Sequence, residues 1–173
     1  MKNEAIKIKL KKLHPDAQLP VKSKEGDFCY DVYAVDREEI LPRVYRYKLG
    51  FSYEIKRDSI AIEYYNKDFA CNGLNINLAN SPIIISIDLR PRSSVYKTGL
   101  SLANCEGTLD EFYRGEAMAM FYHIIPELPP YEVGERVGQI KLGFTLPCEF
   151  EWTDEIDENT ERGKGGFGST SNK

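Results

Sequence analysis

Histidine and cysteine, the residues that most often bind transition metals, are scarce in this chain. Its 173 residues include 2 histidines and 4 cysteines, and no CxxC or HExxH spacing occurs among them. Zinc sites in proteins are usually built from such closely spaced side chains. The sequence therefore predicts no zinc centre.

Long hydrophobic runs are also missing. A membrane-spanning helix needs about 20 consecutive apolar residues, and no stretch of the sequence approaches that length. The first residues, MKNEAIKIKLKKL, alternate lysine with isoleucine and leucine, unlike the continuous apolar segment of a secretory signal peptide. We therefore expect a soluble, cytoplasmic protein that does not bind membranes and whose cysteines are reduced.

An excess of positive charge is the third absence. The chain has 23 Lys and Arg against 27 Asp and Glu, which gives a net charge of −4. Proteins that bind nucleic acids through bulk charge are usually basic, so we expect no nucleic-acid partner. A length of 173 residues is that of one ordinary domain.

What the sequence does contain is apolar residues that alternate with polar ones, as in β-strands with one buried face. The alternation occurs in six stretches, 6–10, 51–55, 76–78, 83–87, 117–121 and 137–142. The 9 prolines recur at short intervals, and each excludes a helix interior or a central ladder bond at its position. We therefore predict an all-β, jelly-roll-like barrel with at most one short helix, near residues 93–97.

Composition divides the chain into unequal parts. Residues 1–148 form the predicted β domain, with an extra β excursion at about 56–82 that contains the hairpin-forming pair Asn72-Gly73. Residues 149–161 hold seven acidic residues and no basic one, and residues 162–173 hold four glycines. On composition alone, these last two parts fit a solvated linker followed by a disordered tail.

The order of residues in the tail supports a second interpretation. Closely spaced glycines expose backbone N–H groups, Arg162 offers parallel donors, and Ser169 and Thr170 offer hydroxyls, which together suit a polyphosphate. Ser169 stands where a Walker A loop requires lysine, so that motif is excluded. Phe167 would be exposed unless it stacked on a flat group such as a nucleobase.

Three other segments carry polar residues that a reaction could use. Arg92 and Ser93 follow a proline, Asp110 lies near Tyr113 on a predicted hairpin, and Gln139 is the one uncharged polar group of its strand. Taken alone, each is more readily explained by ordinary structure. Arg92 and Ser93 could form a salt bridge or a helix cap. Asp110 could stabilise a local turn, and Gln139 could be an ordinary amide on a strand.

Taken together and in order, these segments resemble the five motifs of the trimeric deoxyuridine triphosphatase (dUTPase) family. The matching segments are CYDVYA at 29–34, PRSS at 91–94 with KTG at 97–99, GTLDEFYRG at 107–115, GERVGQ at 134–139 and RGKGGFGST at 162–170. The resemblance covers roughly residues 5–55 and 83–171. It departs at Phe28 and Cys29, where the family has small residues, and at Phe112, where it usually has a second acidic residue.

The resemblance implies a fold, a reaction and chemical roles. A dUTPase β-barrel with a flexible glycine-rich C-terminal arm would hydrolyse dUTP to dUMP and pyrophosphate by water attack at the α-phosphorus. The reaction lowers dUTP and supplies dUMP for thymidylate synthesis. Asp110 would be the catalytic base. Mg²⁺ would be bound mainly through the substrate triphosphate, with no direct protein ligand, and Asp31 would at most touch its water shell.

The implied substrate contacts fall into groups. The phosphates would be bound by Arg92, Ser93, Ser94 and Gln139, with Arg162, Gly168, Ser169 and Thr170 closing over the far end. The uracil and the sugar would be contacted by Asn104, Gly107, Thr108, Leu109, Tyr113 and Met118, with Phe167 stacked on the base. The family shares its sites between subunits, so the resemblance also implies a homotrimer whose arms act as lids.

Two alternatives stay open at the level of sequence. The related dCTP deaminases share the fold and an Arg-Ser-Ser segment, but they place a catalytic glutamate where this chain has Met120. A non-catalytic, nucleotide-sensing module would have the same scaffold without the activity. Met120 and the glycine-rich tail disfavour the deaminase, and the presence of Asp110, Tyr113 and the complete tail disfavours the sensing module.

Overall fold

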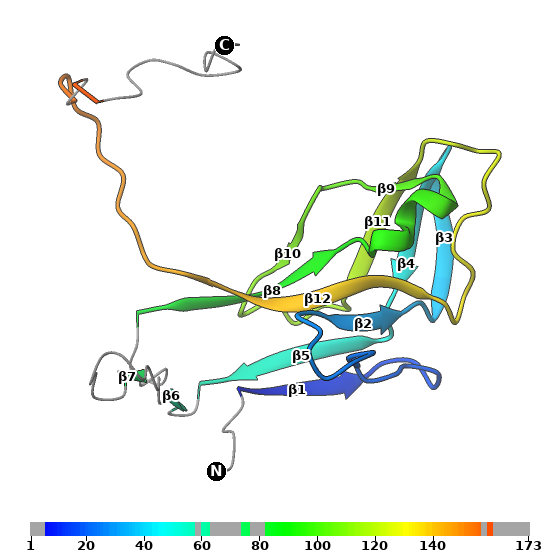
Figure 1. Ribbon diagram of the computed structural model, residues 1–173, viewed down its shortest axis with the longest axis horizontal. Helices are drawn as coiled ribbons and strands as arrows, with labels where there is room; N and C mark the ends of the chain where they lie inside the picture. Colours follow the sequence, from blue (N-terminus) through cyan, green and yellow to red (C-terminus); the bar gives the residue numbers. More distant parts are fainter. Residues whose placement is uncertain (1–5, 58–59, 63–73, 77–81, 157–158, 161–173) are drawn as a thin grey trace.

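The protein is built from short antiparallel strands (Figure 1). A computed structural model describes residues 6–57, 60–62, 74–76, 82–156 and 159–160. One four-stranded sheet has the order β10 (Gly107–Leu109), β8 (Ile84–Arg90), β12 (Arg136–Thr145), β2 (Tyr30–Tyr33). The other has the order β3 (Asp36–Leu41), β4 (Val44–Lys48), β11 (Met118–His123), β9 (Leu100–Leu102). This arrangement confirms the all-β, jelly-roll-like prediction, although these pairings leave both sheets open.

Two smaller pairs complete the strands. β1 (Lys7–Lys12) pairs with β5 (Phe51–Lys56), and β6 (Ile60–Ile62) pairs with β7 (Leu74–Ile76), both antiparallel. The second pair lies within the predicted excursion, so extra β structure is present there. The Asn72-Gly73 pair, expected to form its turn, lies outside the described residues.

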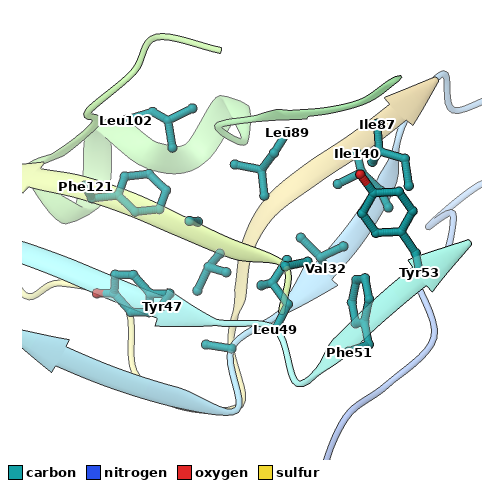
Figure 2. Close-up of a cluster of buried hydrophobic side chains, with 14 of the residues drawn as sticks. Val32, Tyr47, Leu49, Phe51, Tyr53, Ile87, Leu89, Leu102, Phe121 and Ile140 are labelled. Atoms are coloured by element: carbon teal, nitrogen blue, oxygen red, sulfur yellow. The ribbon is translucent and has the colours of Figure 1, made fainter. Parts of the chain in front are cut away.

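The hydrophobic core lies between the two four-stranded sheets and takes in β5 (Figure 2). Strand β8 shows how the sequence builds it, because Ile85, Ile87 and Leu89 are each at most 2% exposed. Side chains on a strand alternate between its faces, so the residues between them, Ser86 and Asp88, point to the other side of the sheet. The strand predicted from apolar alternation therefore separates a core face from a polar face.

Four of the remaining predicted strands are also confirmed, as β1, β5, β11 and β12. Strand β3 was not predicted, because its sequence DREEIL is mostly charged. It is an edge strand of its sheet, and its Asp36 faces Lys48 of β4 with an ion pair of 2.9 Å. Charged side chains are tolerated on edge strands because one side of the strand is not paired.

Among the residues that the structure describes, the one helix is a short 3-10 helix, η1 (Ser93–Thr98), which confirms the predicted position. Gly99 ends it with a φ of +64°, a conformation that strongly favours glycine. Its carbonyl then accepts hydrogen bonds from the N–H groups of Ile124 and Ile125. Within the described part of the chain, no helix has the length and apolar character needed to cross a membrane.

The described cysteines, Cys29, Cys105 and Cys148, are free thiols. After β12 ends at Thr145, the described residues 146–156 leave the sheets without forming a strand (Figure 1). Phe150 and Trp152 on this segment are 94% and 103% exposed. The division of the chain into a domain of residues 1–148, an acidic connector and an arm stays a prediction.

We predict that Gly99→Ala lowers the free energy of unfolding by at least about 2 kcal/mol. A Cβ at this position would lie 2.3 Å from the carbonyl oxygen of Ile125, in addition to the cost of its positive φ. Urea unfolding followed by circular dichroism, at matched protein concentration, measures the change.

Gly26→Ala is the matched control, because a Cβ there meets no heavy atom within 4 Å. It should change stability by less than about 0.5 kcal/mol. Equal effects of the two substitutions would contradict the assigned role of Gly99.

Candidate active site

A buried carboxylate, Asp31, organises one group of the predicted site residues. It lies on β2, is 2% exposed, and accepts four hydrogen bonds from side chains. Oδ2 accepts from the Ser23 hydroxyl at 2.9 Å and from Arg136 Nη1 at 3.0 Å. Oδ1 accepts from Gln139 Nε2 at 3.1 Å and from Arg92 Nε at 3.3 Å. Asp31 therefore brings Arg92 and Gln139, both predicted for phosphate binding, into one cluster.

Arg136 belongs to this cluster, although sequence reasoning did not assign it to the site. It lies three residues before Gln139, and an ideal strand places residues three apart on opposite faces. The pairing of β12 with β2 shifts register between Arg136 and Gly138, and such a bulge re-aims the side chains beside it. The signal that could have found Arg136 is its position within the GERVGQ segment.

The electrostatics of the cluster keep Asp31 ionised. Its burial by itself raises the pKa, but hydrogen bonds from Gln139 and Ser23 and the charge of Arg92 outweigh that effect, so the pKa is lowered. One carboxylate thus stands against two guanidinium groups, those of Arg92 and Arg136, which leaves a net positive charge. Such a cluster suits an anionic ligand.

A cavity of about 460 Å³ adjoins the cluster, and both arginines line it. Its other lining residues are Tyr33, Tyr131, Gly134 and Glu135. The carboxylate of Glu135 accepts a hydrogen bond from the Glu132 backbone at 2.6 Å, so this charge is held within its own turn. Ser94, also predicted for phosphate binding, lies 3.5 Å from Arg92 Nη1, and Ser93 is exposed at the start of η1.

A second group of predicted residues gathers around β10. Thr108, Asp110 and Tyr113 line a larger cavity of about 670 Å³. Asp110 is exposed, and its carboxylate has no hydrogen bond or ion pair with any residue that the structure describes. A carboxylate of this kind can accept a proton from a water molecule inside the cavity.

The ring of Tyr113 has a fixed place beside Asp110. Its hydroxyl donates to the carbonyl of Glu116 at 3.0 Å, and its N–H donates to the carbonyl of Asp110 at 3.0 Å. A Cβ at Gly115 would lie 2.2 Å from the Tyr113 hydroxyl, so only glycine at position 115 leaves room for this ring. The loop therefore presents Tyr113, which is 37% exposed, in one orientation.

The other residues predicted for the nucleoside lie near β10 or on the next strand. Gly107 is buried and Leu109 half-buried, whereas Asn104 is exposed in the preceding turn, where its amide nitrogen would lie 3.4 Å from a Cβ at position 107. Met118 begins β11 and is half-buried. Phe112 is 78% exposed. Five predicted residues lie outside the described part of the chain: Arg162, Phe167, Gly168, Ser169 and Thr170.

A single chain does not bring its two groups of site residues together. The two cavities share no lining residue. Asp110 directly follows Leu109, which pairs with Ile87, whereas Arg92 lies five residues beyond Ile87 along β8 and its extension. At the rise of an extended chain, this spacing corresponds to about 15–20 Å. On one chain, Asp110 and Arg92 therefore line two separate cavities.

The described residues include no group of three or more His, Cys, Asp or Glu side chains arranged to hold a metal ion. Asp31 already accepts four hydrogen bonds, which occupy both of its oxygens. These residues fit a hard cation that is held by ligand phosphates and water, because such a cation needs few protein ligands.

Comparison of the sequence with known proteins identifies close relatives, although no protein-family model matches the chain. It is 31% identical over 169 residues to the deoxyuridine 5′-triphosphate nucleotidohydrolase of Wolinella succinogenes, covering 95% of this chain and 94% of the relative. It is 30% identical to the enzyme of the same name from Hydrogenobaculum sp., covering 97% and 100%.

Solved structures show a similar fold. A mutant dUTPase of Staphylococcus bacteriophage 80alpha, bound to dUpNHpp, matches with a TM-score of 0.67 at 18% identity, covering 95% of this chain and 98% of that one. A mutant dUTPase from phage phi11 of S. aureus, described with a structural Mg(II) ion, matches with a TM-score of 0.59 at 14% identity, covering 87% and 99%. At these identities, the likeness concerns the fold.

We predict that Asp31→Asn lowers the free energy of unfolding at pH 7 by about 1–3 kcal/mol, since an amide cannot replace the charge between two arginines. The pKa of Asp31 is lowered in the folded state, so its stabilisation is present above the ordinary aspartate pKa. It is lost as pH falls through the folded pKa. The gap between wild type and variant should therefore close below about pH 4.

Urea titrations between pH 3 and pH 7 measure this gap. Asp154→Asn, at an exposed side chain that has no hydrogen bond or ion pair with the residues that the structure describes, is the control and should show no pH-dependent gap. A constant gap for Asp31→Asn across this range would contradict the prediction.

Proposed function

Because the chain belongs to the deoxyuridine 5′-triphosphate nucleotidohydrolase (dUTPase) family, we propose that it hydrolyses dUTP to dUMP and pyrophosphate. The observation that carries the proposal is the pairing of two unlike surfaces. One surface has a carboxylate beside a fixed tyrosine, and the other has two arginines around a buried aspartate. The first suits water activation next to a nucleoside, and the second suits a phosphate chain.

In this proposal, Asp110 orients the attacking water and accepts its proton while the water attacks the α-phosphorus. The exposed carboxylate in the larger cavity supports this role, because a general base must reach the proton that it removes. A positioned base of this kind contributes about 10²- to 10⁴-fold to the rate. The reaction otherwise depends on orientation of the water and stabilisation of the phosphate charge.

Arg92, Ser93, Ser94 and Gln139 would bind the phosphates. Asp31 holds the Arg92 guanidinium and the Gln139 amide in place, so these donors need no reorganisation when the substrate binds. Mg²⁺, when bound, would neutralise part of the triphosphate charge. The structural Mg(II) ion of the phi11 enzyme shows that a protein of similar fold binds magnesium. Asp31 would reach the Mg²⁺ bound to the triphosphate only through water.

Tyr113 would lie against the deoxyribose and leave no space for a 2′-hydroxyl, which would exclude UTP. Its fixed orientation over Gly115 supports this role. The uracil would lie among Asn104, Gly107, Thr108 and Leu109, with Met118 as an apolar wall. A narrow pocket of this kind rejects thymine by clash, and unpaired polar groups reject cytosine.

We infer that each complete site is shared between copies in a homotrimer. The separation of Asp110 from Arg92 on one chain, about 15–20 Å by strand rise, supports a site that joins the first surface of one copy to the second surface of another. Arg162, Phe167, Gly168, Ser169 and Thr170 of the C-terminal arm would then close over the nucleotide. The free thiols of the described cysteines support a cytoplasmic location.

The deaminase alternative is not favoured. Met120, at the position of the deaminase glutamate, faces away from the core on β11 and is 36% exposed. A thioether cannot act as a general base. The relatives named above are nucleotidohydrolases, which also weighs against a non-catalytic module.

We predict that the purified protein with Mg²⁺ releases pyrophosphate from dUTP, with at most a few per cent of that rate from dCTP, dTTP or UTP. Separate incubations followed for pyrophosphate and for base identity test this. Release of ammonia from dCTP would support the deaminase instead. Binding of dUTP without turnover would support the sensing module.

We also predict that two inactive variants, Asp110→Asn and Arg92→Gln, complement each other. Each site in a cyclic trimer would take Asp110 from one copy and Arg92 from another, so a trimer that contains both variants should have one intact site in three and about a third of the wild-type activity. Co-expression with two different affinity tags, followed by tandem purification, gives the mixed oligomers. Persistent inactivity of mixed oligomers would contradict the shared site, and normal turnover by Asp110→Asn alone would contradict the assigned base.

A further inference from the structure

Glu111 is a buried acidic residue that the reaction described above does not use. It directly follows Asp110 and is 4% exposed. Its Oε1 accepts a hydrogen bond from Arg57 Nε, and its Oε2 accepts from Arg57 Nη2 at 2.6 Å and from the Ile85 N–H at 3.1 Å. The hydrogen bonds from Arg57 are the main reason that the pKa of Glu111 is lowered. Glu111 is therefore a charged partner of Arg57 held in a bidentate geometry.

Arg57 connects three parts of the chain. Besides its pair with Glu111, its Nη2 donates to the Ile83 carbonyl at 2.7 Å. Arg57 directly follows β5, and Ile83 directly precedes β8, so these two residues flank the segment 58–82. One guanidinium thus ties both ends of that segment to the residue next to Asp110.

The backbone around Asp110 is held from other sides as well. The hydroxyl of Tyr53, a residue that is 2% exposed, donates to the Asp110 carbonyl. Arg114 Nη1 donates to the Glu111 carbonyl at 2.8 Å. The Asp110 carboxylate itself has no partner among the described residues. Its direction is therefore set by its backbone and by the residue that follows it.

We propose that Glu111 and Arg57 are a positioning pair that holds Asp110 in the orientation needed to activate water. A buried ion pair is weak grounds for assuming added stability, because desolvation offsets much of its attraction. A fixed geometry is what a bidentate pair supplies. The inference rests on the proposed role of Asp110, and it gives the ends of segment 58–82 a mechanical connection to the active site.

The test compares steady-state kinetics of dUTP hydrolysis for Arg57→Gln, Glu111→Gln and the double variant. Misplacement of a catalytic group by about 1 Å costs on the order of 10²-fold, so kcat should fall by about 10- to 100-fold while KM stays near the wild-type value. The double variant should be little worse than either single variant, because both remove the same interaction. Arg57→Lys, which keeps the charge without the planar fork, should recover part of kcat.

Arg46→Gln is the matched control. It removes the cross-strand ion pair with Glu38, on the sheet that does not contain Asp110, and should keep the wild-type kcat. Thermal unfolding of each variant separates folding from turnover, and Arg57→Lys provides the answer if Glu111→Gln does not fold.

Several outcomes decide the question. Unchanged kcat in folded Arg57→Gln and Glu111→Gln, alongside an inactive Asp110→Asn, would overturn the positioning pair and leave the proposed function intact. If kcat falls in proportion to the loss of thermal stability, and does so in Arg46→Gln as well as in the variants of the pair, the pair has only a structural role. A wild type that does not hydrolyse dUTP would overturn the proposed function and this inference together.

Discussion

The structure depends on the two-residue repeat of strand β8. This strand is paired on both edges, to β10 and to β12, and its alternate residues either fill the core or face the polar side of the sheet. A slip of one residue would turn Asp88 into the hydrophobic core and Ile87 out of it. Because β10 directly precedes Asp110 and β12 carries Gln139, the register of β8 fixes where these two predicted site residues lie.

Buried carboxylates mark both ends of this strand and its middle. Glu111 accepts the N–H of Ile85 near one end, and Asp31 holds Arg92 just beyond the other. Between them, Asp88 forms an ion pair with Lys141 of β12. Each of these acids pairs with a basic side chain from a different part of the chain. The pairs act as cross-links between strands and fix the relative orientation of those strands. Hydrophobic packing has no preferred direction, so it cannot fix that orientation by itself.

Sequence patterns predicted the elements whose conformation is determined by residues close together in the chain. Alternating apolar residues located the strands β1, β5, β8, β11 and β12, and the short helix expected near residues 93–97 is η1. The charged strand β3 escaped prediction because pairing to β4, and not burial, makes it a strand. Arg136 was missed because a bulge changes the phase of β12. Glu111 was not singled out from the sequence, since nothing in its neighbourhood indicates an arginine 54 positions earlier. The split of the site into two surfaces follows from strand register, which no single segment encodes.

The exposed connector has a practical consequence for spectroscopy. Trp152 is the only tryptophan of the chain, and it lies on the segment that leaves the sheets, fully open to solvent in the single chain. The core contains tyrosines, among them Tyr47, Tyr53 and Tyr131. Tryptophan emission therefore reports the surroundings of the connector and depends little on the packing of the core. A blue shift of that emission on assembly would register contact between copies, independently of the state of the fold.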